Sequence, residues 1–243
     1  MKRLKKSKQT SHNEQHGEIS ASHHERRWSL IDQERQWRID AIKVMVLCFI
    51  SYLYVDIPVA LCFHRFANGD LYEIFSIITL FGDSLGYLVG GLLLFALFRT
   101  AKPYWAQVGL FLFSTVAASG LVADLIKFIA GRSRPKILFS EYFSGFAFFR
   151  WEHDWTSFPS GHSATAFSVA MLVALLFPRW RRLALFAGGM VAFSRIFLVE
   201  HFVSDVIAGS FIGIISTLFL YERFFESKLE RCASKNSLKQ SAK

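Results

Sequence analysis

Most apolar residues of this chain fall in six runs, and these runs limit what it can fold into. A helix needs about 20 apolar residues to cross a bilayer, and the runs are close to that length or somewhat shorter. They are Ile42–Phe63, Ile74–Phe98, Val108–Ala130, Ser163–Phe177, Leu183–Leu198 and Phe202–Tyr221. The pattern predicts an all-α membrane domain of six helices over residues 40–222.

The composition supports a membrane setting. Of the 243 residues 52% are hydrophobic and 26 are Phe, yet the formal charge is +9, a mixture that is unusual for a soluble domain. Many of the charges lie in two basic tails, residues 1–39 and 223–243, which we expect to be cytoplasmic. We expect residues 1–25 to be disordered, because they offer few apolar groups to bury. Residues 26–39 are expected to form an amphipathic helix at the membrane interface.

Loop charges predict the orientation in the plasma membrane. In a six-span protein both tails lie on one side with the loops at 99–102 and 179–182, and all four segments are basic. The positive-inside rule places that side in the cytoplasm. Segments 131–162 and 200–201 then lie at the outer face, which is periplasmic for a bacterial inner membrane.

Three clusters of polar residues follow one another in the back half of the chain. They are Lys127 with Arg134-Pro135, then Pro159-Ser160-Gly161-His162, then Ser194-Arg195 with His201 and Asp205. Cations and backbone N–H groups stabilise the negative charge on the equatorial oxygens of a phosphoryl group in transfer. A neutral histidine can attack phosphorus if a carboxylate fixes its tautomer, and a second histidine can protonate the leaving oxygen. The clusters therefore predict cleavage of a phosphate ester.

The clusters resemble the type 2 phosphatidic acid phosphatase (PAP2) family, which shares its site with the vanadium haloperoxidases. The family pattern K-x6-R-P, P-S-G-H, S-R-x5-H-x3-D is matched at every fixed position, and the resemblance covers roughly residues 40 to 222. It implies a PAP2/haloperoxidase-like helix bundle in which His201 is the nucleophile that forms a phosphohistidine, Asp205 its partner and His162 the acid. The implied phosphate-binding residues are Lys127, Arg134, Ser160, Gly161 and Arg195.

Local sequence also predicts how the clusters meet. Gly131 can end the third helix, and the residue before Pro135 is held extended, so Arg134 can turn back toward Lys127. Arg195 and His201 would face different sides of an unbroken helix, so a turn between them is needed. Ser204 is expected to cap the last helix, with Asp205 in its first turn.

Other polar residues have plainer interpretations. We expect Arg132 and Lys136 to be solvated or to face lipid headgroups. Asp56 and Asp83 are expected to be carboxylates at helix ends, with a place in the substrate cleft as the alternative. Cys48, Cys62 and Cys232 lack metal-ligand spacing and are expected to be free thiols. One segment is unusually aromatic, and an interfacial belt and a lid over lipid chains remain equal alternatives for it: Phe139, Tyr142, Phe143, Phe146, Phe148, Phe149, Trp151 and Trp155.

The sequence predicts a metal-independent lipid phosphatase with no cofactor, because no carboxylate cluster suited to Mg²⁺ is visible. The expected partners are a lipid phosphate and the surrounding membrane lipids, and no nucleic acid. Undecaprenyl diphosphate, phosphatidylglycerophosphate, phosphatidate and the lipid A phosphates all remain candidate substrates. Transfer of the phosphate to a lipid alcohol is an open alternative, and so is a non-enzymatic lipid transporter or scaffold. Haloperoxidase-like oxidation is less favoured in a membrane.

Overall fold

The computed structural model describes residues 35–66 and 69–241, and within these ranges the regular structure is helical apart from one isolated bridge between Arg132 and Phe146. The predictions for residues 1–25 and for the start of the interfacial helix lie outside the described residues; residues 35–39 are helical. The described part of the chain divides into two units, with the boundary between Val46 and Leu47. Every predicted site residue lies in the second unit.

A helix over Arg35–Tyr54 precedes the labelled elements. The α-helices that follow are α2 (Asp56–His64), α3 (Asp70–Thr79), α4 (Ser84–Phe98), α5 (Pro103–Ala130), α6 (Pro135–Glu141), α7 (Gly161–Leu176), α8 (Arg181–Phe197), α9 (Val203–Leu220) and α10 (Glu226–Ser241). Short 3₁₀ turns lie at η1 (Leu80–Gly82), η2 (His153–Trp155) and η3 (Pro178–Trp180), and η4 (Tyr221–Phe225) is π-helical.

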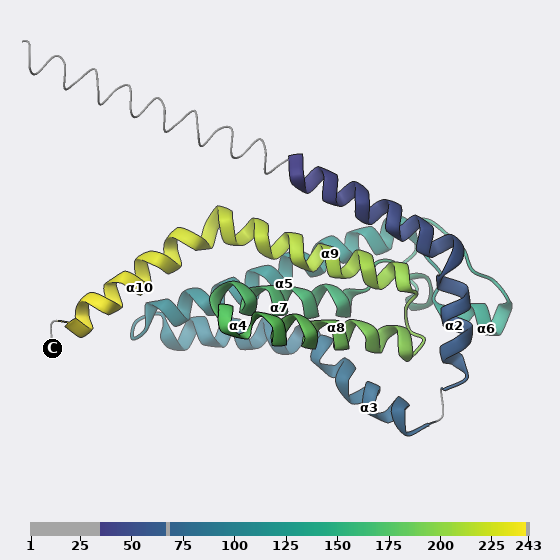
Figure 1. Cartoon of the computed structure of the whole chain (residues 1–243), viewed down its shortest axis with the longest axis horizontal. Coiled ribbons are helices and arrows are strands. Elements are labelled where there is room, and N and C mark those ends of the chain that lie inside the picture. The colour runs from purple at the N-terminus through teal and green to yellow at the C-terminus, as the bar shows by residue number, and fades with distance from the viewer. Residues whose placement is uncertain (1–34, 67–68, 242–243) are drawn as a thin grey trace, which may run out of the picture. The chain divides into compact units, whose positions relative to one another are not determined.

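The helix α7 is the centre of the bundle, because it packs against α5, α8 and α9 while α4 lies along α5 (Figure 1). Small residues allow the close approach. A Cβ added at Gly209 would lie 2.2 Å from the Ser160 carbonyl oxygen, and one at Gly213 would lie 2.3 Å from that of Ala164. Glycine at these two positions therefore lets α9 touch the backbone of α7. This contact fixes the start of α7, where the second motif lies.

Helix length and composition support a membrane protein. Among the described residues, three helical segments are long and apolar enough to cross a bilayer: Asp70–Phe98, Pro103–Ala130 and Val203–Cys232. A fourth span results if Arg35–Tyr54 and α2, which are bent by 57°, count as one, and α7 is a shorter apolar helix. Large apolar side chains such as Leu97 and Leu121 are exposed, as lipid-facing residues are. All six predicted runs are mainly helical, but six crossings remain a prediction.

The helical run does not stop at the expected tail. It continues from α9 through η4 into α10, and Phe225 and Leu229 are buried beside Phe111 of α5. The predicted boundary at residue 222 therefore falls inside a continuous helical run.

Two smaller predictions are confirmed. Asp83 caps α4 by accepting a hydrogen bond from the Leu85 N–H at 2.9 Å. The three cysteines are free thiols.

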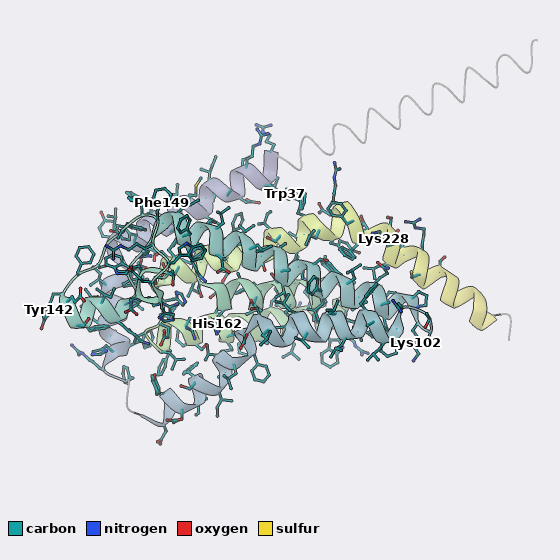
Figure 2. All side chains as sticks on the ribbon, turned by 180° about the vertical axis from the view of Figure 1, so that it is seen from behind. Trp37, Lys102, Tyr142, Phe149, His162 and Lys228 are labelled. Carbon is teal, nitrogen blue, oxygen red and sulfur yellow. The ribbon has the colours of Figure 1, made fainter. Side chains whose placement is uncertain are left out.

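The aromatic segment lies at one end of the second unit. Figure 2 shows Tyr142 and Phe149 at this end, and Lys102 and Lys228 toward the other. Tyr142, Phe149 and Trp151 are exposed. Phe146 is also exposed, and its ring lies over the guanidinium of Arg132, with 5.6 Å between the guanidinium carbon and the ring centre.

Candidate active site

The first motif leaves α5 through Gly131, as predicted. Its φ of 53° is left-handed, and a Cβ there would lie 1.9 Å from the Ala147 carbonyl oxygen, so no other residue fits without a shift of the backbone. Arg134 follows with φ −76° and ψ 158°, the extended conformation that Pro135 favours. The chain therefore turns back at the end of α5 and brings Arg134 toward the α8–α9 turn.

Lys127, Ser160 and Gly161 lie together where α5 meets the start of α7. The ammonium of Lys127 pairs with Asp124 at 3.1 Å. A Cβ added at Gly161 would lie 3.0 Å from the Lys127 ammonium nitrogen. Ser160 is the N-cap of α7, and its hydroxyl oxygen accepts from the Ser163 N–H and hydroxyl. The Ser160 N–H donates to the Asp205 carbonyl at 2.9 Å. The second motif is thus joined to the third through the backbone.

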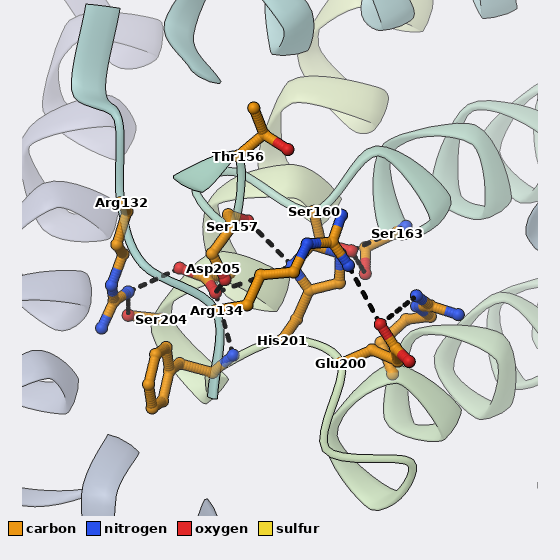
Figure 3. Close-up of polar contacts among 12 residues, drawn as sticks. Arg132, Arg134, Thr156, Ser157, Ser160, Ser163, Glu200, His201, Ser204 and Asp205 are labelled. Carbon is orange, nitrogen blue, oxygen red and sulfur yellow. Dashed lines mark hydrogen bonds and ion pairs between the residues drawn. The ribbon is translucent and has the colours of Figure 1, made fainter. Parts of the chain in front are cut away.

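His201 lies in the turn that the sequence required between α8 and α9. Its backbone N–H donates to the Arg195 carbonyl, and its side chain is buried. Nδ1 lies 2.8 Å from the Ser157 carbonyl oxygen (Figure 3). Because a carbonyl can only accept, we assign the proton to Nδ1, which leaves the lone pair on Nε2. Burial lowers the pKa of His201 to about 3 against the opposing effect of Asp205, so the ring is neutral at physiological pH.

Asp205 occupies the first turn of α9 and is completely buried. One carboxylate oxygen, Oδ2, accepts from the Ser157 hydroxyl at 2.6 Å and the Phe202 N–H at 2.9 Å, and lies 3.6 Å from His201 Nδ1. The other, Oδ1, accepts from Arg132 at 2.5 Å. Asp205 is therefore next to the nucleophile candidate, while the hydrogen bond to the ring comes from the Ser157 carbonyl.

Glu200, which sequence reasoning missed, joins the two predicted phosphate-binding arginines. Its carboxylate lies 3.0 Å from Arg134 Nη1, 3.8 Å from Arg195 Nη2 and 2.7 Å from Lys136 Nζ. Although burial acts in the opposite direction, Lys136 and the two arginines lower the pKa of Glu200. Arg195 also donates to Thr79 at 2.7 Å, and its buried Nε has no hydrogen-bond partner among the described residues. In the sequence, the only signal for this role of Glu200 was its position directly before the motif histidine His201.

His162 lies in the first turn of α7 and is partly buried. It packs against η1, where a Cβ added at Gly82 would lie 2.9 Å from His162 Cβ and Cδ2. Within the described ranges, no hydrogen bond joins its ring to His201. The structure brings the three motifs to the same end of the bundle.

Two predictions for polar residues were wrong. Arg132 is 1% exposed, because its guanidinium faces inward to Asp56 and Asp205 and is not solvated. Ser204 is the second residue of α9, and the N-cap is Phe202, whose N–H bonds to Asp205. Asp56 stands at the start of α2, as expected of a helix-end carboxylate, but it is also fully buried. Asp56 is a charged residue inside the first apolar run of the sequence, and this position was the signal that it has a buried partner.

Comparison with known proteins identifies the family. Residues 108–228 match the model of the PAP2 superfamily. Over 207 residues the chain is 32% identical to a lipid A 1-phosphatase of Rhizobium johnstonii. The alignment covers 76% of this chain and 84% of the relative. The chain belongs to the PAP2 superfamily. As a PAP2 protein it is a membrane phosphatase, a hydrolase of phosphate esters.

Two solved structures share the PAP2 fold at 22% sequence identity. LpxE of Aquifex aeolicus has a TM-score of 0.52, and the match covers 69% of this chain and 95% of that one. A PAP2-type phosphatidylglycerolphosphate phosphatase of Bacillus subtilis has a TM-score of 0.56, with coverage of 76% and 96%.

The position of Glu200 leads to a prediction for this PAP2 phosphatase. If Arg134 and Arg195 bind phosphate, the anion must compete with the Glu200 carboxylate. Glu200→Gln should lower the inhibition constants of vanadate and inorganic phosphate about fivefold, which corresponds to roughly 1 kcal/mol. Glu152→Gln is the matched control, because its exposed carboxylate pairs with Arg150. Weaker inhibition of the Glu200 variant would contradict this account.

Proposed function

We propose that this PAP2 phosphatase hydrolyses a lipid phosphate through a phosphohistidine at His201. The supporting observation is the hydrogen bond between His201 Nδ1 and the Ser157 carbonyl oxygen, at 2.8 Å. It leaves Nε2 as the unprotonated ring nitrogen, and burial keeps the ring neutral. Asp205, 3.6 Å from Nδ1, supplies negative charge when the ring becomes cationic.

The first step is attack of His201 Nε2 on phosphorus. The N–P bond forms while the bond from phosphorus to the lipid oxygen breaks, and the electron pair leaves on that oxygen. His162 protonates the oxygen, and the same residue then takes a proton from the water that attacks the phosphohistidine. Free phosphate leaves and His201 returns to its neutral form. Lys127, Arg134 and Arg195, with the Ser160 hydroxyl and the Gly161 N–H, stabilise the equatorial oxygens.

The proposed substrate is lipid A 1-phosphate. The similarity to the Rhizobium lipid A 1-phosphatase, over 84% of that protein, supports this choice. Purified protein should release phosphate from lipid A 1-phosphate with a higher kcat/KM than from undecaprenyl diphosphate, phosphatidylglycerophosphate or phosphatidate. A preference for one of the other three lipids would reject the assignment. If ³²P from the substrate appears on a lipid alcohol and not as free phosphate, the protein is a phosphotransferase.

The proposed orientation places six spans in the inner membrane, both termini in the cytoplasm and the site at the outer face. Lys102 and Lys228 lie toward the end of the second unit away from Tyr142, as Figure 2 shows. Basic residues favour the cytoplasmic side. The exposed aromatic side chains at the site end suit the opposite interface.

Cysteine labelling tests this topology. In a variant without Cys48, Cys62 and Cys232, a cysteine at exposed Glu152 should react with a membrane-impermeant thiol reagent, once the outer membrane is permeabilised. One at Thr100, which is also exposed, should react only after the inner membrane is opened. The reverse pattern would place the site in the cytoplasm.

A further inference from the structure

Arg132 lies at the centre of a buried network that the PAP2 motifs do not include. Its Nη2 is 2.7 Å from Asp56 Oδ2, and its Nη1 is 2.5 Å from Asp205 Oδ1. The side chains of all three residues are at most 2% exposed. Three aromatic rings surround the guanidinium: those of Tyr52, Phe146 and Phe202. Water is therefore largely excluded from the network.

Asp56 is held as firmly as Asp205. Its Oδ1 accepts from the Ser51 hydroxyl at 2.9 Å and from the Ser204 N–H at 3.0 Å. Its Oδ2 accepts from the Ser204 hydroxyl at 2.5 Å. These contacts join the start of α2 to the first turn of α9, the turn that carries Asp205. The position of one carboxylate is thus linked to the position of the other.

The network contains one cation between two carboxylates, so its net charge is −1. Although burial acts against the charged guanidinium, Asp205 and Asp56 raise the pKa of Arg132 above its ordinary value. Arg132 lies on one side of Asp205 and His201 on the other (Figure 3). A pair of Arg132 and Asp205 alone would be neutral. Asp56 engages the other nitrogen of the guanidinium, and the negative charge of Asp205 is then only partly compensated.

We propose that Asp56 and Arg132 are positioning residues that orient Asp205 and keep one net negative charge beside His201 for the cation formed when His201 is phosphorylated. This inference rests on the proposed function. When Nε2 bonds to phosphorus, Nδ1 keeps its proton toward the Ser157 carbonyl and the ring becomes cationic. The proton for the leaving oxygen comes from His162, and Asp205 does not accept one. The network thus acts in the chemical step more than in substrate binding.

Removal of the Asp56 charge should slow turnover without weakening binding. Asp56→Asn preserves the shape and makes the network neutral. In the full chain in detergent, kcat and the single-turnover rate of phosphohistidine formation should fall about 10- to 100-fold, the scale seen when an outer-shell partner of a metal ligand is removed. KM should stay close to its wild-type value. Unchanged kcat in Asp56→Asn would overturn the proposal.

A charge-restoring double variant separates electrostatics from scaffolding. Arg132→Gln alone leaves two buried carboxylates without a cation, and it should lower the melting temperature strongly. Asp56→Asn with Arg132→Gln returns the net charge to −1. The double variant should melt higher than Arg132→Gln and turn over faster than Asp56→Asn. Multiplicative losses in the double variant would show that the network only holds the fold, and would reject the proposal.

A control removes a buried hydrogen bond elsewhere in the bundle. Thr217→Val breaks the contact between the Thr217 and Thr115 hydroxyls, which are 2.5 Å apart between α9 and α5. It should lower the melting temperature and leave kcat close to wild type. A comparable fall in its kcat would attribute the Asp56→Asn effect to stability and reject the proposal.

If wild-type protein releases phosphate from none of the four lipids, the proposed function fails. The melting temperatures still test the charge balance in that case.

Discussion

Replacement of His201 by Ala should abolish turnover on every phosphate ester and leave no covalent phosphoenzyme. If Nε2 makes the first bond to phosphorus, no other group among the site residues is placed to replace it. The loss in kcat should be about 10⁶-fold, the scale seen when a protease loses its nucleophile. Rapid quenching with ³²P-labelled substrate would detect the phosphohistidine in the wild type.

His64→Ala is the matched control for this experiment. His64 is exposed at the end of α2 and stacks on Phe139 with 3.8 Å between the ring centres. Its removal should leave the phosphoenzyme in place. A phosphoenzyme that persists in His201→Ala would show that another residue is the nucleophile.

Replacement of His162 by Ala should reduce activity according to the leaving group. An alkyl phosphate leaves as a basic alkoxide and needs a proton, so the variant should lose about 10²- to 10⁴-fold on such an ester. Nitrophenyl phosphate leaves more easily, and its loss should be much smaller. The experiment compares kcat/KM for the two esters in the wild type and the variant.

The same variant can report on the second step. If His162 also activates water, phosphohistidine at His201 should accumulate in His162→Ala when an activated ester is supplied. Equal losses on the two esters would remove the acid assignment. The acid role of His162 rests on the PAP2 motif, since no hydrogen bond joins its ring to His201 within residues 35–66 and 69–241.

Much of the site was predictable because its parts are local in sequence. The end of α5 at Gly131, the extended Arg134 before Pro135 and the turn between Arg195 and His201 all follow from backbone preferences within a few residues. The apolar runs determined the helices for a similar reason, since a lipid-facing helix is apolar along its whole length. The motif spacing predicted which residue types would meet.

Only the tertiary structure decided how the charges pair. Asp56 and Arg132 are 76 residues apart, and Arg132 and Asp205 are 73 apart, so no local pattern joins them. The sequence suggested a solvated Arg132, because a loop arginine usually faces water, whereas two buried carboxylates turn it inward. The same applies to the Ser157 carbonyl, a backbone group that fixes the His201 ring and that no side-chain motif can reveal.

The sequence determined the chemistry available to this protein. The packing of α2 and α9 around the loop after α5 decided which charges are buried together, because burial makes each one depend on a partner from a distant segment.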